Sequence, residues 1–378
     1  MRGKSVCRVI FVAITALFLA SALCRLIYSQ NYEQTYFLAT EQSTHQISLS
    51  VTHQLYEYYL QKDHQLTLDD FASFVTPYAF AQVAIEVTSL FEEEEDFVNA
   101  ILMICHQIEY QVTDEPKYPV ETIIDNRGDC DLLSYVAASI ILAHDVDVIL
   151  LYYEHESHMN IGVNLPDPPQ DVRSTASYIE YNGSRYYVAE CTGDDWQNGW
   201  RVGECPPELE QASVAVIALE DCELIAPGQV SASLGALTPS TLTVEVSPRF
   251  IVEGNTVEIS GQVRPSVSDG EVAIYALTNG NWEIVGTATL DLEGRFSFSW
   301  RPAFWGQHYL KASWSGDSEY AGADSTVVSI YVLPETTLLI GGIIVIVAVS
   351  ILILLLYKAT HSEKALTLEE NPVVTGPN

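Results

Sequence analysis

Apolar positions divide the chain into two regions with different periodicity. Up to about residue 225, apolar residues recur at helical spacing or gather in short continuous runs. From 241 to 333 they alternate with polar residues, with the period of two that is typical of half-buried strands. The segment 238–240, Thr-Pro-Ser, is a credible linker between the two regions. The pattern therefore predicts an α+β domain followed by an all-β domain.

Residues 30–112 are predicted to form an N-terminal helical part of the first domain. Three stretches carry helical signals, with Pro77 as a break inside the second: residues 46–61, 71–90 and 97–110. The third stretch follows the acidic run 92–95, which suits the positive end of a helix dipole.

Residues 113–225 are predicted to form the core of the first domain. The apolar run 132–142 predicts a buried helix, and it follows the polar sequence Asn-Arg-Gly-Asp-Cys that ends at Cys130. Four short runs downstream predict strands: 147–153, 159–163, 178–181 and 185–189. Asn182-Gly183 is a tight-turn signal that joins the last two runs into a hairpin. A helix packed on such a sheet gives an α+β fold.

Residues 238–334 are predicted to form a small antiparallel β-sandwich of Ig-like architecture. Turn signals separate five alternating runs: 256–263, 271–277, 295–300, 308–314 and 325–332. Phe296, Phe298 and Trp300 fall on one face of the third run, as half-buried strand residues do. The region contains no cysteine, so no disulfide can join its sheets.

Two apolar segments predict attachment to a membrane. In residues 1–29, basic residues precede the uncharged run 9–24, which has the features of a signal peptide or an uncleaved signal anchor. Residues 336–357 carry no charge and, at ~1.5 Å per residue, are long enough for a transmembrane helix across a ~30 Å hydrocarbon core. The positive-inside rule places the N-terminal cations and the tail 358–378 in the cytoplasm. The expected location is the cell membrane, with both domains outside the cytoplasm.

Charge and cysteine content limit the partners and the redox chemistry. The 378 residues include 50 acidic and 17 basic side chains, for a net charge of −33. This argues against nucleic acid as a partner, because binding phosphates needs a basic surface. Five of the seven cysteines lie in the part expected outside, which leaves at least one free thiol if the others pair. A Cys205–Cys222 disulfide and a fully reduced set both remain open, and Asn182-Gly183-Ser184 is an N-glycosylation sequon.

Cys130 is the best candidate for a nucleophile. The dipole and free N–H groups at a helix N-terminus stabilise a thiolate, and Gly128 permits close backbone approach. His158, at the start of a predicted strand, is the candidate general base. Glu190, at the end of another strand, can hold the imidazole in the required tautomer. The alternatives are other histidines and carboxylates of the same region: His155, His144, His106, Asp194 and Asp195.

A zinc site is the competing chemical interpretation, because Cys130, His155, His158 and Cys191 are residue types that bind zinc. The chain contains no Cys-x-x-Cys spacing and no Gly-rich phosphate loop. No metal and no cofactor is therefore expected.

Five short motifs lie between about residues 65 and 207: Tyr118-Pro119-Val120-Glu121-Thr122, Gly128-Asp129-Cys130, His158-Met159 with Gly162-Val163, Tyr187-Val188-Ala189-Glu190 with Thr192, and Trp200 with Gly203-Glu204. Together they resemble the transglutaminase-like superfamily, which has the papain-like cysteine enzyme fold, and its membrane-anchored archaeal and bacterial members in particular. The resemblance implies a catalytic triad of Cys130, His158 and Glu190. The superfamily more often has Asp in the acid position, and many members carry an acidic residue where this chain has Leu132. The segment 240–333 resembles the Ig-like repeats of prokaryotic surface proteins.

These observations predict a membrane-anchored surface enzyme that attacks peptide or carboxamide bonds of extracellular peptides or proteins. Resolution of its thioester by water would make it a protease or amidase, and resolution by an amine would make it an acyl transferase. The alternative is a catalytically inactive module for adhesion or partner binding, carried on an Ig-like stalk.

Overall fold

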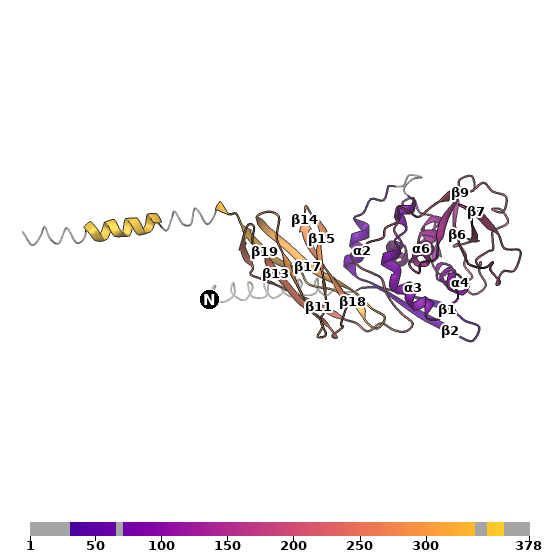
Figure 1. The fold of residues 1–378 in the computed structure, drawn as a ribbon, viewed down its shortest axis with the longest axis horizontal. Helices are drawn as coiled ribbons and strands as arrows, with labels where there is room; N and C mark the ends of the chain where they lie inside the picture. The colour runs from indigo at the N-terminus through magenta and orange to yellow at the C-terminus, as the bar shows by residue number, and fades with distance from the viewer. Residues whose placement is uncertain (1–30, 66–70, 337–345, 359–378) are drawn as a thin grey trace, which may run out of the picture.

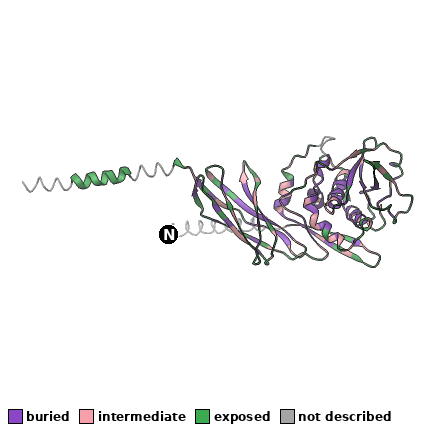
Figure 2. Cartoon of the chain, viewed as in Figure 1, coloured by how far each residue is buried: buried purple, intermediate pink, exposed green. Residues whose placement is uncertain are grey.

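The computed structural model describes residues 31–65, 71–336 and 346–358 of the chain. The two domains follow one another in space as they do in sequence, and a helix lies beyond the far end of the second domain (Figure 1). Buried residues run through the interior of both domains, whereas the helical residues 346–358 are exposed (Figure 2).

The first domain opens with a β-hairpin, so the prediction of a helical 30–112 region is wrong at its start. β1 (Tyr32–Ala39) pairs antiparallel with β2 (Thr44–Val51), and β10 (Ser231–Ser233) adds to the other edge of β2. Ile47, Leu49 and Val51 are buried with polar residues between them, which is the period of a strand. The helix expected over 46–61 begins only at α2 (His53–Leu60).

The remaining helices before residue 126 are short: η1 (Phe71–Phe74), η2 (Pro77–Phe80), α3 (Ala81–Thr88), α4 (Glu94–Cys105) and α5 (Pro119–Asp125). Pro77 begins a helix, where its missing N–H and fixed φ cost nothing. The predicted acidic first turn of α4 is confirmed, but α4 ends before the expected residue 110. There the chain forms β3 (Glu109–Tyr110), which pairs in parallel with β4 (Arg127–Gly128).

A central helix, α6 (Cys130–Leu142), packs on a five-stranded sheet with the order β7-β8-β6-β5-β9. All neighbouring strands are antiparallel: β5 (Val148–Tyr153), β6 (His158–Val163), β7 (Tyr178–Tyr181), β8 (Ser184–Ala189) and β9 (Ala215–Ile217). The predicted helix and the first four strands are confirmed. Asn182 and Gly183 have the positive φ values, 49° and 85°, that a tight hairpin turn requires.

The second domain is a β-sandwich, and the alternation predicted for it is confirmed. β11 (Thr241–Ser247), β13 (Val257–Arg264) and β16 (Arg295–Trp300) form one sheet. The other has the order β12-β19-β17-β14-β15, with β18 beside β17. Its strands are β12 (Phe250–Val252), β14 (Glu271–Thr278), β15 (Asn281–Thr289), β17 (Gly306–Gly316), β18 (Ala321–Asp324) and β19 (Val328–Leu333). Ile259, Ile274 and Trp314 belong to the core between the sheets.

The two domains are in direct contact across their junction. The Gln54 N–H donates to Asp324 Oδ2 at 2.8 Å, and Lys311 Nζ lies 3.2 Å from the Glu57 carboxylate. Gly322 approaches the first domain so closely that a Cβ atom there would lie 2.6 Å from Thr52 Cγ2. The segment expected as a linker therefore joins two domains that already share a packed interface.

The expected membrane segments lie largely outside the described residues. These include the leader 1–29, positions 337–345 of the predicted span 336–357, and the tail 358–378 except Lys358. Within the described ranges, no helix is long and apolar enough to cross a membrane.

Candidate functional site

Cys130 is the first residue of α6 and is largely buried. Asp129 precedes it with an extended backbone, and its carboxylate accepts hydrogen bonds from the Thr113 N–H at 2.8 Å and the Thr113 hydroxyl at 3.0 Å. The segment after β3 is thereby held against the start of α6. At Gly128, a Cβ atom would lie 3.0 Å from Leu132 Cβ, so a side chain there would crowd α6. The local sequence thus places the thiol at a helix end with its backbone fixed on both sides.

His158 begins β6, and its imidazole lies between the thiol and a carboxylate. Its Nε2 atom is 2.8 Å from Glu190 Oε2, which leaves Nδ1 as the ring nitrogen outside this bond. Burial alone would lower the pKa of His158, but hydrogen bonding to Cys130 and Glu190 outweighs burial and raises the pKa to about 10. The surroundings therefore favour an imidazolium at this position.

Glu190 follows the last residue of β8, and its carboxylate is fully buried. Both of its oxygens accept hydrogen bonds. Oε1 accepts from the Thr192 N–H at 2.9 Å and the Thr192 hydroxyl at 2.5 Å. Oε2 accepts from Asn160 Nδ2 at 3.3 Å in addition to His158. Burial would raise the pKa of Glu190, but the bonds from His158 and Thr192 lower it below the ordinary value. A buried charged carboxylate thus faces the imidazole.

The structure brings together the three residues that the sequence singled out and gives four of the five alternatives other surroundings. His155 is exposed in the loop between β5 and β6, and His144 packs on Phe97 with ring centroids 4.8 Å apart. Asp194 is exposed, and Asp195 caps a turn by accepting from the Asn198 N–H at 3.0 Å. His158 is the described histidine that is hydrogen bonded to the Glu190 carboxylate and whose pKa is raised by Cys130.

His106 lies behind the site, in a role that the sequence did not indicate. It is buried, and its Nε2 atom is 3.1 Å from the Glu190 backbone carbonyl oxygen. The loop after Glu190 rests on this ring, since a Cβ atom at Gly199 would lie 2.4 Å from His106 Nδ1. His106 therefore supports the backbone that presents the Glu190 carboxylate.

The roles of three further residues near the site were missed. Asn160 shares a strand face with His158, two residues on, and Thr192 stands two residues after Glu190; these spacings could have indicated both. Tyr110 could not be found in this way, because the β3–β4 pairing alone brings it opposite Gly128. Burial, and then the charge of Cys130, raise the pKa of Tyr110, whose side chain is half exposed at the edge of the site.

A cavity of about 400 Å³ lies against the loop that follows Glu190. The loop that contains Gly193 and Trp200 lines it, together with Arg173 and Cys205. The Arg173 guanidinium donates to the buried Glu204 carboxylate and to the Asn198 and Gly199 carbonyls of this loop. One wall of this cavity is thus fixed by charge-assisted hydrogen bonds.

All five cysteines of the described part are free thiols, so the Cys205–Cys222 disulfide that the sequence left open is not formed. Burial raises the pKa of Cys105 to about 12 and places that of Cys191 well above its ordinary value. Over the same residues, no group of three or more histidine, cysteine or acidic side chains is arranged to hold a metal ion. The Cys130 thiol donates to the Ser157 carbonyl oxygen at 3.9 Å, and Cys130 is the described cysteine that raises the pKa of a histidine, His158.

Comparison with known proteins identifies the second domain. Residues 242–333 match the family of bacterial Ig-like domains (group 3), and no transglutaminase-like family matches the chain. No curated protein matches it. Solved structures with local similarity include the CARDB domain of a Pyrococcus furiosus protein in complex with di-metal ions (13% identity, 25% of this chain and 94% of that chain, TM-score 0.20). Another is the PKD domain of human KIAA0319 (16% identity, 26% and 85%, TM-score 0.19).

Proposed function

We propose that this protein is a membrane-anchored, extracytoplasmic thiol enzyme of transglutaminase-like type. It acts on peptide or carboxamide bonds through Cys130, His158 and Glu190. The observation that carries the proposal is the buried Glu190 carboxylate, 2.8 Å from the ring nitrogen of a histidine whose pKa is also raised by Cys130. A helix start supplies the nucleophile, and two strand ends of one sheet supply its partners.

The geometry supports a two-step acyl transfer. The Cys130 thiolate attacks the carbonyl carbon, a C–S bond forms, and the electron pair of the carbonyl moves to oxygen. The Cys130 backbone N–H, at the start of α6, is aligned with the helix dipole and is suited to stabilise that oxygen. Collapse breaks the C–N bond, and the His158 imidazolium gives its proton to the departing amine or ammonia.

The second step regenerates the thiolate and the imidazolium. Water or a primary amine attacks the thioester while neutral His158 takes its proton, and the C–S bond breaks to release the acid or the new amide. Glu190 keeps its charge throughout and stabilises the imidazolium. Hydrolysis and transfer need the same residues, so the proposal includes both.

The apolar segments and the second domain support the location. Residues 9–24 and 336–357 have the hydropathy of membrane segments. Basic residues precede the first segment, and Lys358 follows the second, so the positive-inside rule assigns both of these ends to the cytoplasm. Bacterial Ig-like domains match residues 242–333, which precede the second apolar segment.

A second function is a non-catalytic surface module that binds a partner. The identified Ig-like domain favours it, because such a sandwich can serve as a stalk without any chemistry in the domain it carries.

Thiol labelling and turnover separate the two functions. The full chain is treated with iodoacetamide, and release of ammonia or amine from a peptide library is measured for the wild type, Cys130→Ala and the matched control Cys222→Ala. If the protein is an enzyme, we expect preferential alkylation of Cys130, loss of turnover in Cys130→Ala, and wild-type turnover in Cys222→Ala. Equal turnover in all three proteins would contradict the enzyme proposal.

A further inference from the structure

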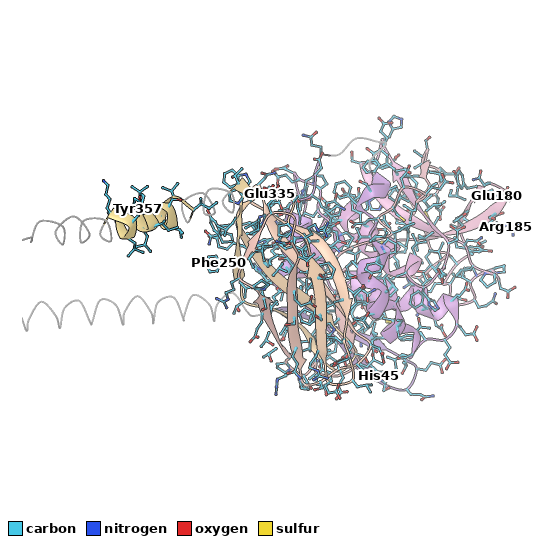
Figure 3. The ribbon with its side chains drawn as sticks, turned by 60° about the vertical axis from the view of Figure 1, so that its left-hand side comes forward. His45, Glu180, Arg185, Phe250, Glu335 and Tyr357 are labelled. Carbon is cyan, nitrogen blue, oxygen red and sulfur yellow. The ribbon has the colours of Figure 1, made fainter. Side chains whose placement is uncertain are left out.

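Exposed aromatic residues gather on the sandwich where the chain leaves it for the apolar segment. We call Phe250, Trp305, Tyr309 and Tyr331 the aromatic face. Phe250 is 72% exposed and Trp305 is 59% exposed. Figure 3 shows Phe250 and Glu335 at the end of the sandwich nearest the helix that carries Tyr357.

Strand register makes these side chains neighbours. Phe250 of β12 pairs with Tyr331 of β19, and Tyr331 also pairs with Gln307 of β17. Tyr309 is two residues from Gln307, on the same side of β17. Gly306 pairs with Val332, so Trp305 lies level with Leu333, close to the start of the apolar segment at 336.

The aromatic face does not belong to the core of the domain. Over residues 306–310 of β17 and 328–333 of β19, where the two strands pair, the buried positions are His308, Leu310, Ile330 and Val332, and the aromatic residues alternate with them toward solvent. The interior is therefore complete without the aromatic face, and a cluster of exposed aromatic side chains indicates a contact surface.

The charged residues near the aromatic face do not oppose contact with a membrane surface. Arg249 and Glu253 flank β12 in the sequence, Arg301 follows β16 and Glu335 follows β19, so these segments carry two basic and two acidic side chains in a chain whose net charge is −33. Trp and Tyr are enriched at the headgroup level of bilayers, where the ring is buried and the polar atom stays hydrated.

We propose that the aromatic face docks onto the headgroup region of the bilayer in which residues 336–357 are anchored. This inference rests on the membrane attachment under the proposed function, because the anchor at 336 holds the face within reach of lipid. Docking sets the end of this sheet, where β12, β19 and the start of β17 lie side by side, against the headgroups and fixes the tilt of the sandwich.

The test uses the full chain in phosphatidylcholine vesicles whose acyl chains carry bromine near the headgroup, which quenches nearby tryptophan. We expect quenching in the wild type that is lost in Trp305→Phe and retained in Trp196→Phe, which alters a tryptophan of the first domain. Phe250→Ser with Tyr331→Ser should reduce the quenching of Trp305 while Trp305 stays in place.

Flotation of the same vesicles distinguishes failure of the docking inference from failure of the membrane attachment. A chain that does not float with the vesicles contradicts the membrane attachment. A chain that floats but shows equal quenching in wild type and Trp305→Phe overturns the docking inference alone. Cross-linking between chains that depends on Trp305, without Trp305 quenching, would assign the aromatic face to a second copy and would also overturn it.

Discussion

The Nε2 atom of His158 lies 2.8 Å from Oε2 of Glu190, a carboxylate that is fully buried and also bound by Asn160 and Thr192. Four hydrogen bonds to one buried carboxylate fix its position and its charge. The carboxylate in turn holds the His158 imidazole in place and stabilises its protonated form.

Replacing Glu190 with Gln should lower the pKa of His158 from about 10 toward its ordinary value and reduce kcat/KM by roughly 10²–10⁴-fold. Gln keeps the shape of the side chain but cannot stabilise an imidazolium. The pKa is measured by NMR titration of His158, and kcat/KM with the best substrate of the labelling experiment. An unchanged titration of His158 would show that Glu190 does not govern it.

Replacing Thr192 with Val should have a smaller effect of the same kind. The variant loses the hydroxyl bond to Glu190 but keeps the N–H bond, so we expect about 1 kcal/mol of lost stability and a loss of activity below that of Glu190→Gln. Thr175→Val, in an exposed loop, is the matched control. Thermal melting and kcat/KM check both expectations, and an effect equal to that of the control would contradict them.

Asp131 should make stability depend on pH. Burial, then hydrogen bonding to Asp129 and its charge, raise the pKa of Asp131 to about 7. Between the unfolded value near 4 and about 7, the folded protein binds a proton that the unfolded chain does not. The free energy of unfolding therefore falls as pH rises through this window.

Asp131→Asn should consequently be more stable than the wild type at about pH 8, with a smaller difference at about pH 5. Thermal midpoints at the two pH values measure it, with the exposed Asp194→Asn as control. A midpoint of Asp131→Asn that follows the wild type across the range would refute the assignment.

The domain interface should be sensitive to one added methyl group. At Gly322 a Cβ atom would lie 2.5 Å from the Ser315 carbonyl oxygen and 2.6 Å from Thr52 Cγ2, whereas at Gly235 no atom lies within 4 Å. We expect Gly322→Ala to destabilise by about 1–3 kcal/mol and to separate the melting of the two domains, and Gly235→Ala to leave melting unchanged. Calorimetry checks this, and identical scans for both variants would contradict it.

The candidate site could be predicted because each of its residues stands where a local pattern changes. Cys130 precedes a continuous apolar run, His158 begins a strand, and Glu190 follows one. The hairpin of β1 and β2 was missed because residues 46–51 lead directly into a real helix. The strand β10 that completes its sheet comes from the far end of the domain. His106 shows the same limit, since its contact with Glu190 arises only from tertiary packing.

The strand β17 sets the distance between the predicted anchor and the first domain. β17 runs from Gly306, level with Val332 beside the anchor, to Gly316, whose carbonyl accepts a hydrogen bond from Gln82 of the first domain. Eleven residues of strand correspond to about 36 Å. In an anchored molecule, Cys130 would therefore work at a set height above the lipid. Proteins that project tens of ångströms from the surface would be within its range, and bonds flush with the membrane would not.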